Sequence, residues 1–501
     1  MTEPPRSDPR PTADVTLILE GTYPYVAGGV SSWVHQMLTS HPQRRFSLFH
    51  IGPHPGAYTR RLYQIPGNVS CLEEVHCRGG ALVRRRPIRS RRGRSRVLAA
   101  IRRLHTDDTV DDALLDDLAA DDLSVSDFLH GDEAFELLRD ELYPRLSPDA
   151  PFTAFFWHFR AMHVPMLRLL AALCPPAHVY HAVSTGYAGL VGAVTSWRLG
   201  RPLVVTEHGL YARERELELS RAAWIDDGDA AGPLVPRPSP LRRFWSRWFR
   251  MLSRIAYHRA ARLLTLSEVN RAKQLADGAD PAKIVVVPNG VDQERWRPVA
   301  ERRQGGDPQR PRIGFVGRIV PIKDVITLIR AAGLAREQVA FELWIVGPDE
   351  EDPAYAARCR SLVAQLNLEE DVRFLGSQPV ADIYPQLDAV VLTSLSEGQP
   401  LVILEAHAAG LPVIASDVGA CREMIEGGDD GDRRLGPSGI VTRVASPADT
   451  AAALVRLIRN SELRVAMGRA GLQRVSARYQ LRQVVASYDS LYASMVATSP
   501  A

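Results

Sequence analysis

Short runs of consecutive apolar residues alternate with longer segments in which apolar residues recur at helical spacing. A continuous apolar run is typical of a strand buried on both faces, as in a parallel sheet covered by helices. In the first half of the chain we expect strands at Val15–Glu20, Phe46–Ile51, His178–Ala182, Leu203–Thr206, Arg262–Leu266 and Ile284–Val287. This alternation predicts an α/β fold with a doubly wound parallel sheet.

A second series of strands follows a stretch that breaks this pattern. Residues 294–312 contain three prolines, paired glycines and many charges, so we interpret 296–311 as an interdomain linker. Beyond it we expect strands at Ile313–Val316, Glu342–Val346, Val372–Leu375, Ala389–Thr393 and Pro412–Ala415. The tail from about Ser461 to Ser494 has helical periodicity, and its last part is expected to cross back to the first domain.

Two similar α/β units place a ligand in the cleft between them, at the carboxyl ends of the strands. We therefore expect two Rossmann-like doubly wound domains at 14–295 and 312–480, with a crossover helix and tail at 481–501. Residues 1–13 are polar and rich in proline, which predicts a disordered N-terminus without a signal peptide. No run approaches the roughly 18 apolar residues of a membrane-spanning helix, so a cytoplasmic location is expected.

Composition narrows the function classes only slightly. The 501 residues carry a formal net charge of +3, which gives no global case for nucleic-acid binding. Only three of the 61 basic residues are lysines, namely Lys273, Lys283 and Lys323. The five cysteines contain no Cys-x-x-Cys pair, which favours buried free thiols in a reducing compartment over a disulfide framework.

The first domain carries a charged insertion at about 78–135. Residues 78–103 hold eleven arginines and no acid, and residues 107–133 hold eleven acids and no lysine or arginine. The arginine block can be interpreted as an arm that binds nucleic acid or a membrane. We favour a solvated, partly flexible insertion whose two halves screen one another, because the opposite charges are neighbours.

A second basic segment, Leu241–Arg259, combines helical periodicity with six arginines and no acid. Its apolar residues fall on one side of the expected helix. Such a helix can lie on an anionic membrane or dock to a membrane partner. The alternative is an ordinary helix that buries its tryptophan face in the first domain, and the sequence leaves both open.

The strongest chemical motif runs from Ser394 to Glu405. It follows a predicted strand, turns at Gly398 and enters a helix near Pro400. The free amides at the helix start, on Leu401 and Val402, form an anion site. Carboxylates at Glu397 and Glu405 can accept hydroxyl hydrogen bonds, which is the chemistry that a ribose diol or a sugar needs.

A second motif, Gly317-Arg318-x4-Lys323, also follows a predicted strand. Arg318 and Lys323 can turn inward from one loop to hold a diphosphate. Two weaker motifs lie in the first domain. The turn containing Gly28 and Gly29 lets a ligand approach a helix start, and His208 ends the strand before Gly209.

Together these motifs resemble the retaining GT-B glycosyltransferases of family 4. The segments Leu19–Trp33, Thr206–Gly209 and Gly347–Pro353 look more specifically like the PelF branch, the glycosyltransferases of Pel-type exopolysaccharide systems. The resemblance covers residues 14–494 except the charged insertion. It implies a GT-B fold, a UDP-sugar donor, a polysaccharide acceptor and an inner-membrane export or synthase complex as partner, with no nucleic acid.

The resemblance also implies roles for individual residues. Glu405 would bind the ribose, while Arg318, Lys323 and the amides of Leu401 and Val402 would bind the diphosphate. Glu397 and Gly398 would contact the donor sugar, and Gly376 and Ser377 would lie near the uracil. Gly28, Gly29 and His208 would lie by the anomeric carbon on the acceptor side. The catalytic set is then His208, Glu397, Arg318 and Lys323.

The implied reaction needs no carboxylate nucleophile and no essential metal, because the basic groups and helix amides can stabilise the departing UDP. Two Asp-x-Asp sequences, Asp227–Asp229 and Asp430–Asp432, fall in polar loops and do not support a manganese site. Two other functions remain open, a nucleotide-sugar epimerase with the same architecture and a catalytically weak scaffold of a membrane synthase. Location is expected to be cytoplasmic, with peripheral binding at the inner membrane face as the alternative.

Overall fold

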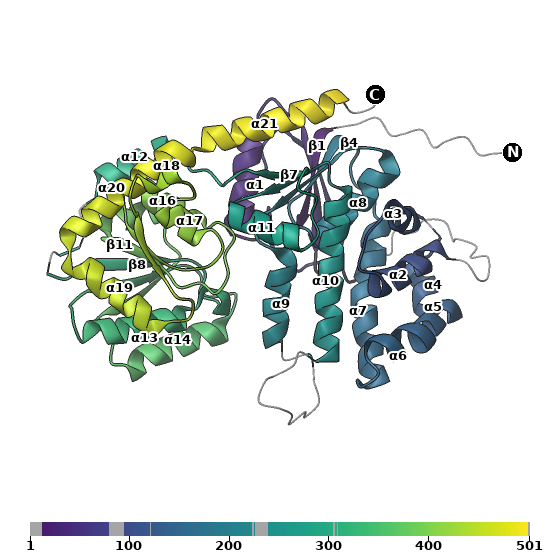
Figure 1. The fold of residues 1–501 in the computed structure, drawn as a ribbon, viewed down its shortest axis with the longest axis horizontal. Helices are drawn as coiled ribbons and strands as arrows, with labels where there is room; N and C mark the ends of the chain where they lie inside the picture. Colours follow the sequence, from purple (N-terminus) through teal and green to yellow (C-terminus); the bar gives the residue numbers. More distant parts are fainter. Residues whose placement is uncertain are drawn as a thin grey trace. The chain divides into compact units, whose positions relative to one another are not determined.

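The computed structural model describes residues 13–79, 95–120, 122–222, 225, 239–303, 306–307 and 309–498. The chain divides into two compact units, each with one parallel sheet flanked by helices (Figure 1). Unit 1 contains the described residues up to Thr265, residues 272–285 and the described end of the chain from Tyr488. Unit 2 contains residues 266–271 and 286–487. The predicted GT-B architecture of two doubly wound domains is confirmed.

Unit 1 is built on a seven-stranded sheet with the order β3-β2-β1-β4-β5-β6-β7. Its strands are β1 Ala13–Glu20, β2 Phe46–Gly52, β3 Val69–His76, β4 Ala177–Ala182, β5 Leu203–Glu207, β6 Arg262–Thr265 and β7 Ile284–Val286. The central strands are almost wholly buried, as the apolar runs predicted. The edge strand β3 was not predicted, because it is polar and mostly exposed or half-buried.

Helices cover both faces of this sheet and extend beyond it. They are α1 Gly29–Ser40, α2 Arg96–Thr106, α3 Asp112–Ala119, α4 Val125–His130, α5 Asp132–Glu136, η1 Leu137–Leu142, α6 Tyr143–Leu146, α7 Phe152–Ala171, α8 Tyr187–Leu199, α9 Tyr211–Arg221, α10 Pro240–Arg259 and α11 Glu268–Ala276, the last shared with unit 2. In Figure 1 helices α2 to α7 gather beside α10.

From Ser95 on, the described residues of the charged insertion form helices packed in unit 1, which corrects the expectation of a solvated and partly flexible segment for this part. Leu98, Leu104, Leu115 and Leu118 of α2 and α3 are buried in the core that also contains α7 and α10. The basic and acidic blocks do pair, for example through ion pairs of Arg103 with Asp107 and Asp111 at 2.9 and 2.8 Å. The part of the arginine block at 80–94 lies outside the described residues.

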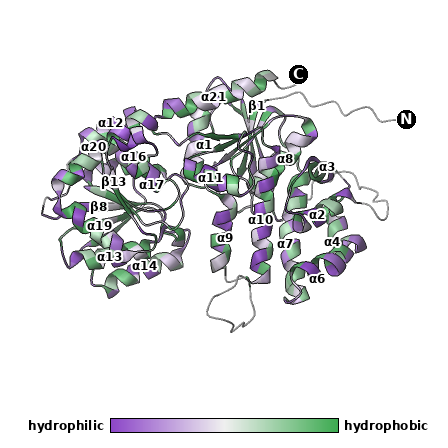
Figure 2. Ribbon diagram, in the orientation of Figure 1, coloured by the Kyte–Doolittle hydropathy of each residue, from purple (hydrophilic) through white to green (hydrophobic). Residues whose placement is uncertain are grey.

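Helix α10 buries its aromatic face, so the alternative in which this face meets a membrane or a partner is wrong. Its residues Leu241, Phe244, Trp245, Trp248, Phe249, Leu252 and Ile255 are all buried. Polar and apolar residues alternate along the helix in Figure 2. The arginines of the other face bind within the protein: Arg247 pairs with Asp108 at 2.9 Å, and Arg250 pairs with Glu216 at 2.5 Å.

The C-terminal helix, α21 Leu481–Thr498, begins in unit 2 and ends in unit 1, which confirms the predicted crossover. Its last half is held in unit 1 by a buried hydrogen-bond network. The Tyr492 hydroxyl bonds to Nδ1 of His181 at 2.6 Å, and Nε2 of His181 bonds to Thr206 Oγ1 at 2.8 Å. Thr206 in turn bonds to the Tyr488 hydroxyl at 3.1 Å. Because burial lowers the pKa of His181 to about 3, this network contains a neutral imidazole.

Unit 2 has a six-stranded sheet with the order β10-β9-β8-β11-β12-β13, the order of doubly wound nucleotide-binding folds. Its strands are β8 Arg312–Val316, β9 Glu342–Val346, β10 Val372–Gly376, β11 Ala389–Leu392, β12 Val413–Ser416 and β13 Gly439–Thr442. All the pairs are parallel. Strand β13 was not predicted, because it is short and begins with glycine.

The helices of unit 2 pack on both faces of its sheet. They are α12 Gln293–Glu301, η2 Pro321–Lys323, α13 Val325–Arg336, α14 Pro353–Gln365, α15 Val380–Ile383, η3 Tyr384–Gln386, α16 Leu401–Ala408, α17 Cys421–Glu426, α18 Asp430–Arg433, α19 Pro447–Arg459 and α20 Ser461–Arg478.

The segment interpreted as a linker at 296–311 is instead part of unit 2. Helix α12 buries Trp296 and Val299 in the core of that unit and has Pro298 inside it. The chain passes between the units before this helix, around residues 265–286. The cysteine expectation also needs one correction, since Cys71 is exposed and Cys77 half-buried, whereas the other three thiols are buried and all five are free.

We expect Tyr492→Phe to loosen α21, because it removes the hydroxyl that bonds to buried His181. An orphaned buried polar group costs about 1–3 kcal/mol, so the thermal unfolding midpoint should fall and amide hydrogen exchange in α21 should quicken. Tyr63→Phe is a matched control, since the Tyr63 hydroxyl meets only the exposed Ser32 Oγ, at 3.3 Å. Equal effects of the two variants would contradict an anchoring role for the network.

Candidate active site

In the sheet of unit 2, the direction in which successive strands are added reverses between β8 and β11. The chain winds in opposite directions from β8 and β11, so the loops after these strands lie side by side at the carboxyl edge. These are the two loops that carry the predicted motifs. They are joined directly, because the Leu395 amide donates to the Ile322 carbonyl at 2.8 Å and Thr393 Oγ1 donates to the Lys323 carbonyl at 3.2 Å.

Lys323 and Glu397 form an ion pair at the centre of this junction. Lys323 Nζ donates to Glu397 Oε1 at 2.6 Å, and the Ser394 hydroxyl donates to the same oxygen at 2.6 Å. The side chains of Lys323 and Glu397 are only 19% and 11% exposed, so water screens the pair weakly. The structure therefore brings together two predicted site residues and adds Ser394, which begins the predicted motif but was given no role.

A tight backbone contact fixes the position of the Glu397–Gly398 loop. Gly419 has a φ of +51°, and a Cβ there would lie 2.0 Å from the Glu397 carbonyl oxygen and 2.5 Å from that of Gly398. The Ala420 amide donates to the Gly398 carbonyl at 2.9 Å. A residue with a side chain at 419 would have to displace the loop that carries Glu397.

Helix α16 begins at this loop, with Pro400 as its N-cap and no side chain that caps it. Within the described part of the chain, the amides of Leu401 and Val402 have no recorded hydrogen-bond partner. Such amides, with the helix dipole behind them, attract an anion. Glu405 lies on the next turn, and burial raises the pKa of its carboxyl to about 7, although nearby Arg295 opposes this shift.

Arg318 lies on the same loop as Lys323 but bonds elsewhere. Its guanidinium pairs with Glu351, in the loop after β9, at 2.5 Å. Gly347 in that loop packs on Gly317, since a Cβ on Gly347 would lie 2.0 Å from the Gly317 carbonyl oxygen. The Gly347 amide donates to the carbonyl of Gly376, which precedes Ser377. The loops after β8, β9 and β10 thus contact one another at one sheet edge, with Arg318 held by an acid.

The predicted residues of unit 1 lie at the equivalent edge of its own sheet. Gly28 and Gly29 stand at the exposed start of α1, and no atom lies within 4 Å of a Cβ built on either. His208 follows β5 and packs edge-on against Trp33 of α1, with ring centroids 4.5 Å apart. Burial lowers the pKa of His208 to about 3, and its Nε2 is buried without a recorded hydrogen-bond partner. The ring is therefore neutral near pH 7.

Two acids in unit 1 bind the starts of helices, a role that was not predicted from the sequence. Glu20, at the end of β1, accepts from the Tyr211 hydroxyl at 3.0 Å and from the Ala188 amide of α8 at 3.2 Å. Glu207, at the end of β5, is buried and accepts from the Tyr211 amide at the start of α9 at 3.1 Å. Each carboxylate caps the start of a helix, and its position at a strand end was the available signal.

Only one of the two Asp-x-Asp sequences falls in the described part of the chain. Asp227–Asp229 lies outside the described residues. Asp432 is buried and pairs with buried Arg474 at 2.7 Å, which is a structural role. Across the described residues, no three His, Cys, Asp or Glu side chains are gathered so that they could hold a metal ion.

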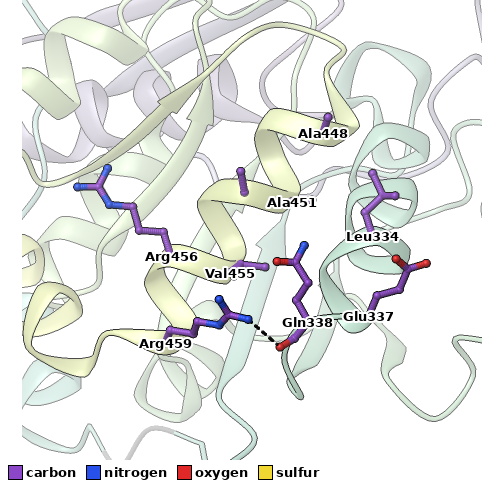
Figure 3. A pocket seen from close by; sticks show the side chains of 9 residues that line it. Leu334, Glu337, Gln338, Ala448, Ala451, Val455, Arg456 and Arg459 are labelled. Carbon is purple, nitrogen blue, oxygen red and sulfur yellow. Dashed lines mark hydrogen bonds between the residues drawn. The ribbon is translucent and has the colours of Figure 1, made fainter.

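Another concavity of unit 2 contains none of the predicted site residues. It lies between α13 and α19 and is lined by Leu334, Ala451, Val455 and Arg459, among others (Figure 3). Arg459 donates to the Gln338 carbonyl there at 3.2 Å. The lining is largely apolar and gathers no set of reactive groups, so this concavity is not the candidate site.

Comparison with known proteins identifies the family. Residues 13–282 match the family described as "Domain of unknown function (DUF3492)", and residues 310–460 match "Glycosyl transferases group 1". The chain is 32% identical over 350 residues to a D-inositol 3-phosphate glycosyltransferase of Kineococcus radiotolerans, covering 66% of this chain and 72% of the relative. It belongs to the group 1 glycosyltransferases.

A second relative and two solved structures are also similar to this chain. The chain is 33% identical over 304 residues to a D-inositol 3-phosphate glycosyltransferase of Nocardia farcinica, covering 58% of this chain and 61% of the relative. The fold is similar to sucrose-phosphate synthase of Thermosynechococcus elongatus, with a TM-score of 0.60, 17% identity and coverage of 97% and 100%. It is also similar to HepE of Anabaena in complex with UDP and glucose, with a TM-score of 0.58, 15% identity and coverage of 96% and 100%.

We expect Gly419→Ala to disturb the Glu397–Gly398 loop, since the new methyl group would overlap two carbonyl oxygens. Ligand binding by unit 2 should weaken about tenfold, as measured by calorimetry with UDP, and the unfolding midpoint should fall further than in the control because the methyl group overlaps the loop as well as straining the backbone. Gly436→Ala is a suitable control, because Gly436 also has a positive φ but no atom lies within 4 Å of its Cβ position. Identical UDP affinity in the two variants would count against the loop as the binding element.

Proposed function

We propose that this protein is a retaining glycosyltransferase that transfers a hexose or N-acetylhexosamine from a UDP-sugar to a growing exopolysaccharide. The observation that carries the proposal is the Lys323–Glu397 pair beside the unpartnered amides of α16, at the switch point of the unit 2 sheet. Family membership supports sugar transfer, and the fold neighbour that holds UDP and glucose supports the donor class. The polymer acceptor rests on the resemblance of Leu19–Trp33 to the PelF branch.

The donor site assigns each group a chemical task. The diphosphate is neutralised by Lys323, Arg318 and the amides of Leu401 and Val402. To bind it, Lys323 gives up its contact with Glu397, and Arg318 gives up its contact with Glu351. Glu405 accepts from the ribose diol. Glu397 and Gly398 contact the donor sugar, and Gly376 and Ser377 contact the uracil. Gly28, Gly29 and His208 of unit 1 serve the acceptor side.

The reaction breaks the bond between the anomeric carbon and the phosphate oxygen, and forms a bond from the acceptor hydroxyl to the same face of that carbon. The proton of the acceptor hydroxyl passes to the departing phosphate. Negative charge grows on UDP as it leaves, so the positive groups of unit 2 bind the transition state more strongly than the substrate. This route needs no enzyme nucleophile and no essential metal. Neutral His208 can hydrogen-bond a hydroxyl without adding charge.

We further propose a cytoplasmic location, with an inner-membrane export or synthase complex as partner. In the described part of the chain, no helix combines the length and the apolar character needed to cross a bilayer. Since α10 buries its aromatic face, docking to such a complex would use another surface.

Turnover decides the proposed reaction. We expect transfer from one of UDP-glucose, UDP-N-acetylglucosamine and UDP-N-acetylgalactosamine to an oligosaccharide acceptor, with retention of the anomeric configuration by NMR. Lys323→Ala should lower kcat/KM by about 10²–10³, since it removes charge stabilisation of the leaving group. Lys273→Ala is the matched control, as a second of the three lysines without a site role. Formation of an epimer, or donor binding without transfer, would overturn the proposal.

Donor binding should strengthen as pH rises from 6 to 8. The pKa of Glu405 is raised to about 7, so its carboxyl is mostly protonated at pH 6 and ionised at pH 8. Only the ionised form accepts hydrogen bonds from both ribose hydroxyls on its two oxygens. Calorimetry with UDP-glucose, whose diphosphate has no group that titrates in this range, should give an affinity several-fold higher at pH 8, and Glu405→Gln should remove this difference. A pH-dependence that survives in Glu405→Gln would sink the ribose assignment.

A further inference from the structure

Two buried amide side chains next to the start of α16 form a reciprocal pair. The Asn289 backbone amide donates to Gln399 Oε1 at 2.5 Å, and Asn289 Nδ2 donates to the Gln399 carbonyl at 3.0 Å. Both residues are only 5% exposed and belong to unit 2. Gln399 lies between Gly398 and Pro400, two residues before the free amide of Leu401.

This pairing fixes which way each amide group points. Rotating the Gln399 carboxamide would bring its NH₂ against the Asn289 N–H, and rotating that of Asn289 would bring its oxygen against a carbonyl. Both alternatives place like groups together, so the observed orientation is favoured. It leaves Gln399 Nε2 as a buried donor and Asn289 Oδ1 as a buried acceptor, and neither atom has a hydrogen-bond partner among the residues that the structure describes.

Buried polar atoms in native proteins nearly always have hydrogen-bond partners, so two orphans in one pair require a reason. A ligand at the α16 start supplies one. A phosphate oxygen could satisfy the Gln399 donor but would repel the Asn289 acceptor. A sugar carries several hydroxyls, each of which donates and accepts, so it can satisfy both atoms.

We propose that Gln399 and Asn289 form a sugar-recognition pair, in which Gln399 Nε2 donates to one hydroxyl of the donor sugar and Asn289 Oδ1 accepts from a hydroxyl. This inference rests on the proposed function and deepens it. Glu397 and Gly398 precede Gln399 directly, so one continuous loop reads the sugar, and the helix amides that follow bind the diphosphate. Gln399 is then a specificity-determining residue of the donor site.

The test measures coupling between Gln399 and single sugar hydroxyls. UDP, the UDP-sugar turned over (UDP-glucose first) and its monodeoxy analogues are titrated into wild type and Gln399→Met, which keeps the side-chain length but removes both polar atoms. In wild type, one deoxy position should bind about threefold to tenfold more weakly than the parent. In Gln399→Met that ratio should fall to about one, and the affinity for UDP itself should change less than twofold.

If circular dichroism shows that Gln399→Met is unfolded, a second variant provides the test. Gln399→Glu retains an oxygen for the Asn289 N–H and replaces only the Nε2 donor. Its new charge affects the parent sugar and the analogue alike, so the ratio between them still reports the lost donor. The same ratio should collapse in this variant.

The outcomes separate the two levels of inference. A deoxy ratio that is the same in the variants and wild type would overturn the sugar-recognition pair, because a merely structural role does not distinguish hydroxyls. An equal loss of UDP and UDP-sugar affinity in Gln399→Met would assign the donor to the phosphates instead and would also overturn it. Failure of wild type to bind any UDP-sugar would refute the proposed function itself.

Discussion

The reversal of strand order between β8 and β11 is the constraint on which the candidate site depends. Because consecutive strands wind outward from this point in both directions, the loops after β8 and β11 have no crossover helix between them. Loops separated by about 70 residues can therefore bond to each other, as Leu395 does to Ile322. Lys323 and Glu397 meet as a consequence of topology, and unit 1 repeats the device where Glu20 of β1 reaches the start of α8 after β4.

The ion pair at this junction has consequences for binding. The Lys323–Glu397 contact at 2.6 Å is little exposed, so its electrostatic energy is favourable, and in the proposed function an incoming diphosphate would have to replace it. The diphosphate of a UDP-sugar carries two negative charges against one on a carboxylate, and the α16 amides would favour it as well. In the absence of donor the acid keeps the lysine ordered and spares it the cost of an unpaired buried charge. Ser394 holds the acid in place, so the site is pre-organised.

Much of the fold could be predicted because buried parallel strands are continuous apolar runs. Every predicted strand has a counterpart, and the misses have physical reasons. The edge strand β3 is solvated and carries Glu73 and Glu74, so its sequence lacks an apolar run. Helix α12 contains Pro298 amid charged residues, a composition typical of a linker. The structure shows that it is a packed helix, because Trp296 is buried in the core of unit 2. Such burial depends on tertiary contacts that a local pattern does not contain.

The site was predictable to a similar degree. The motifs placed Glu397, Lys323 and the α16 amides at the ends of predicted strands, since glycine, proline and charge at a strand end are local signals. That their two loops are neighbours follows from the sheet order, which was not predicted from the sequence. The Arg318–Glu351 pair and the Asn289–Gln399 pair join residues 33 and 110 positions apart. Nothing in the sequence near Gln399 indicates that its side-chain oxygen accepts a hydrogen bond while its side-chain nitrogen, among the described residues, donates none. The face of α10 was ambiguous because an amphipathic helix with aromatic and basic sides suits a core and a membrane equally.

Arginine and lysine have different chemical tasks in this chain, as Arg474 and Lys323 show. Arg474 is fully buried and donates to Asp432, Ser438 and three backbone carbonyls at once, which needs the five donors of a planar guanidinium. A lysine has three donors on one atom and would leave part of this set unsatisfied. In the proposed function the requirement at position 323 is the opposite, since one compact charge would have to release a carboxylate oxygen and take a phosphate oxygen. A guanidinium that bound Glu397 in a bidentate manner would resist that exchange, which favours lysine at this position.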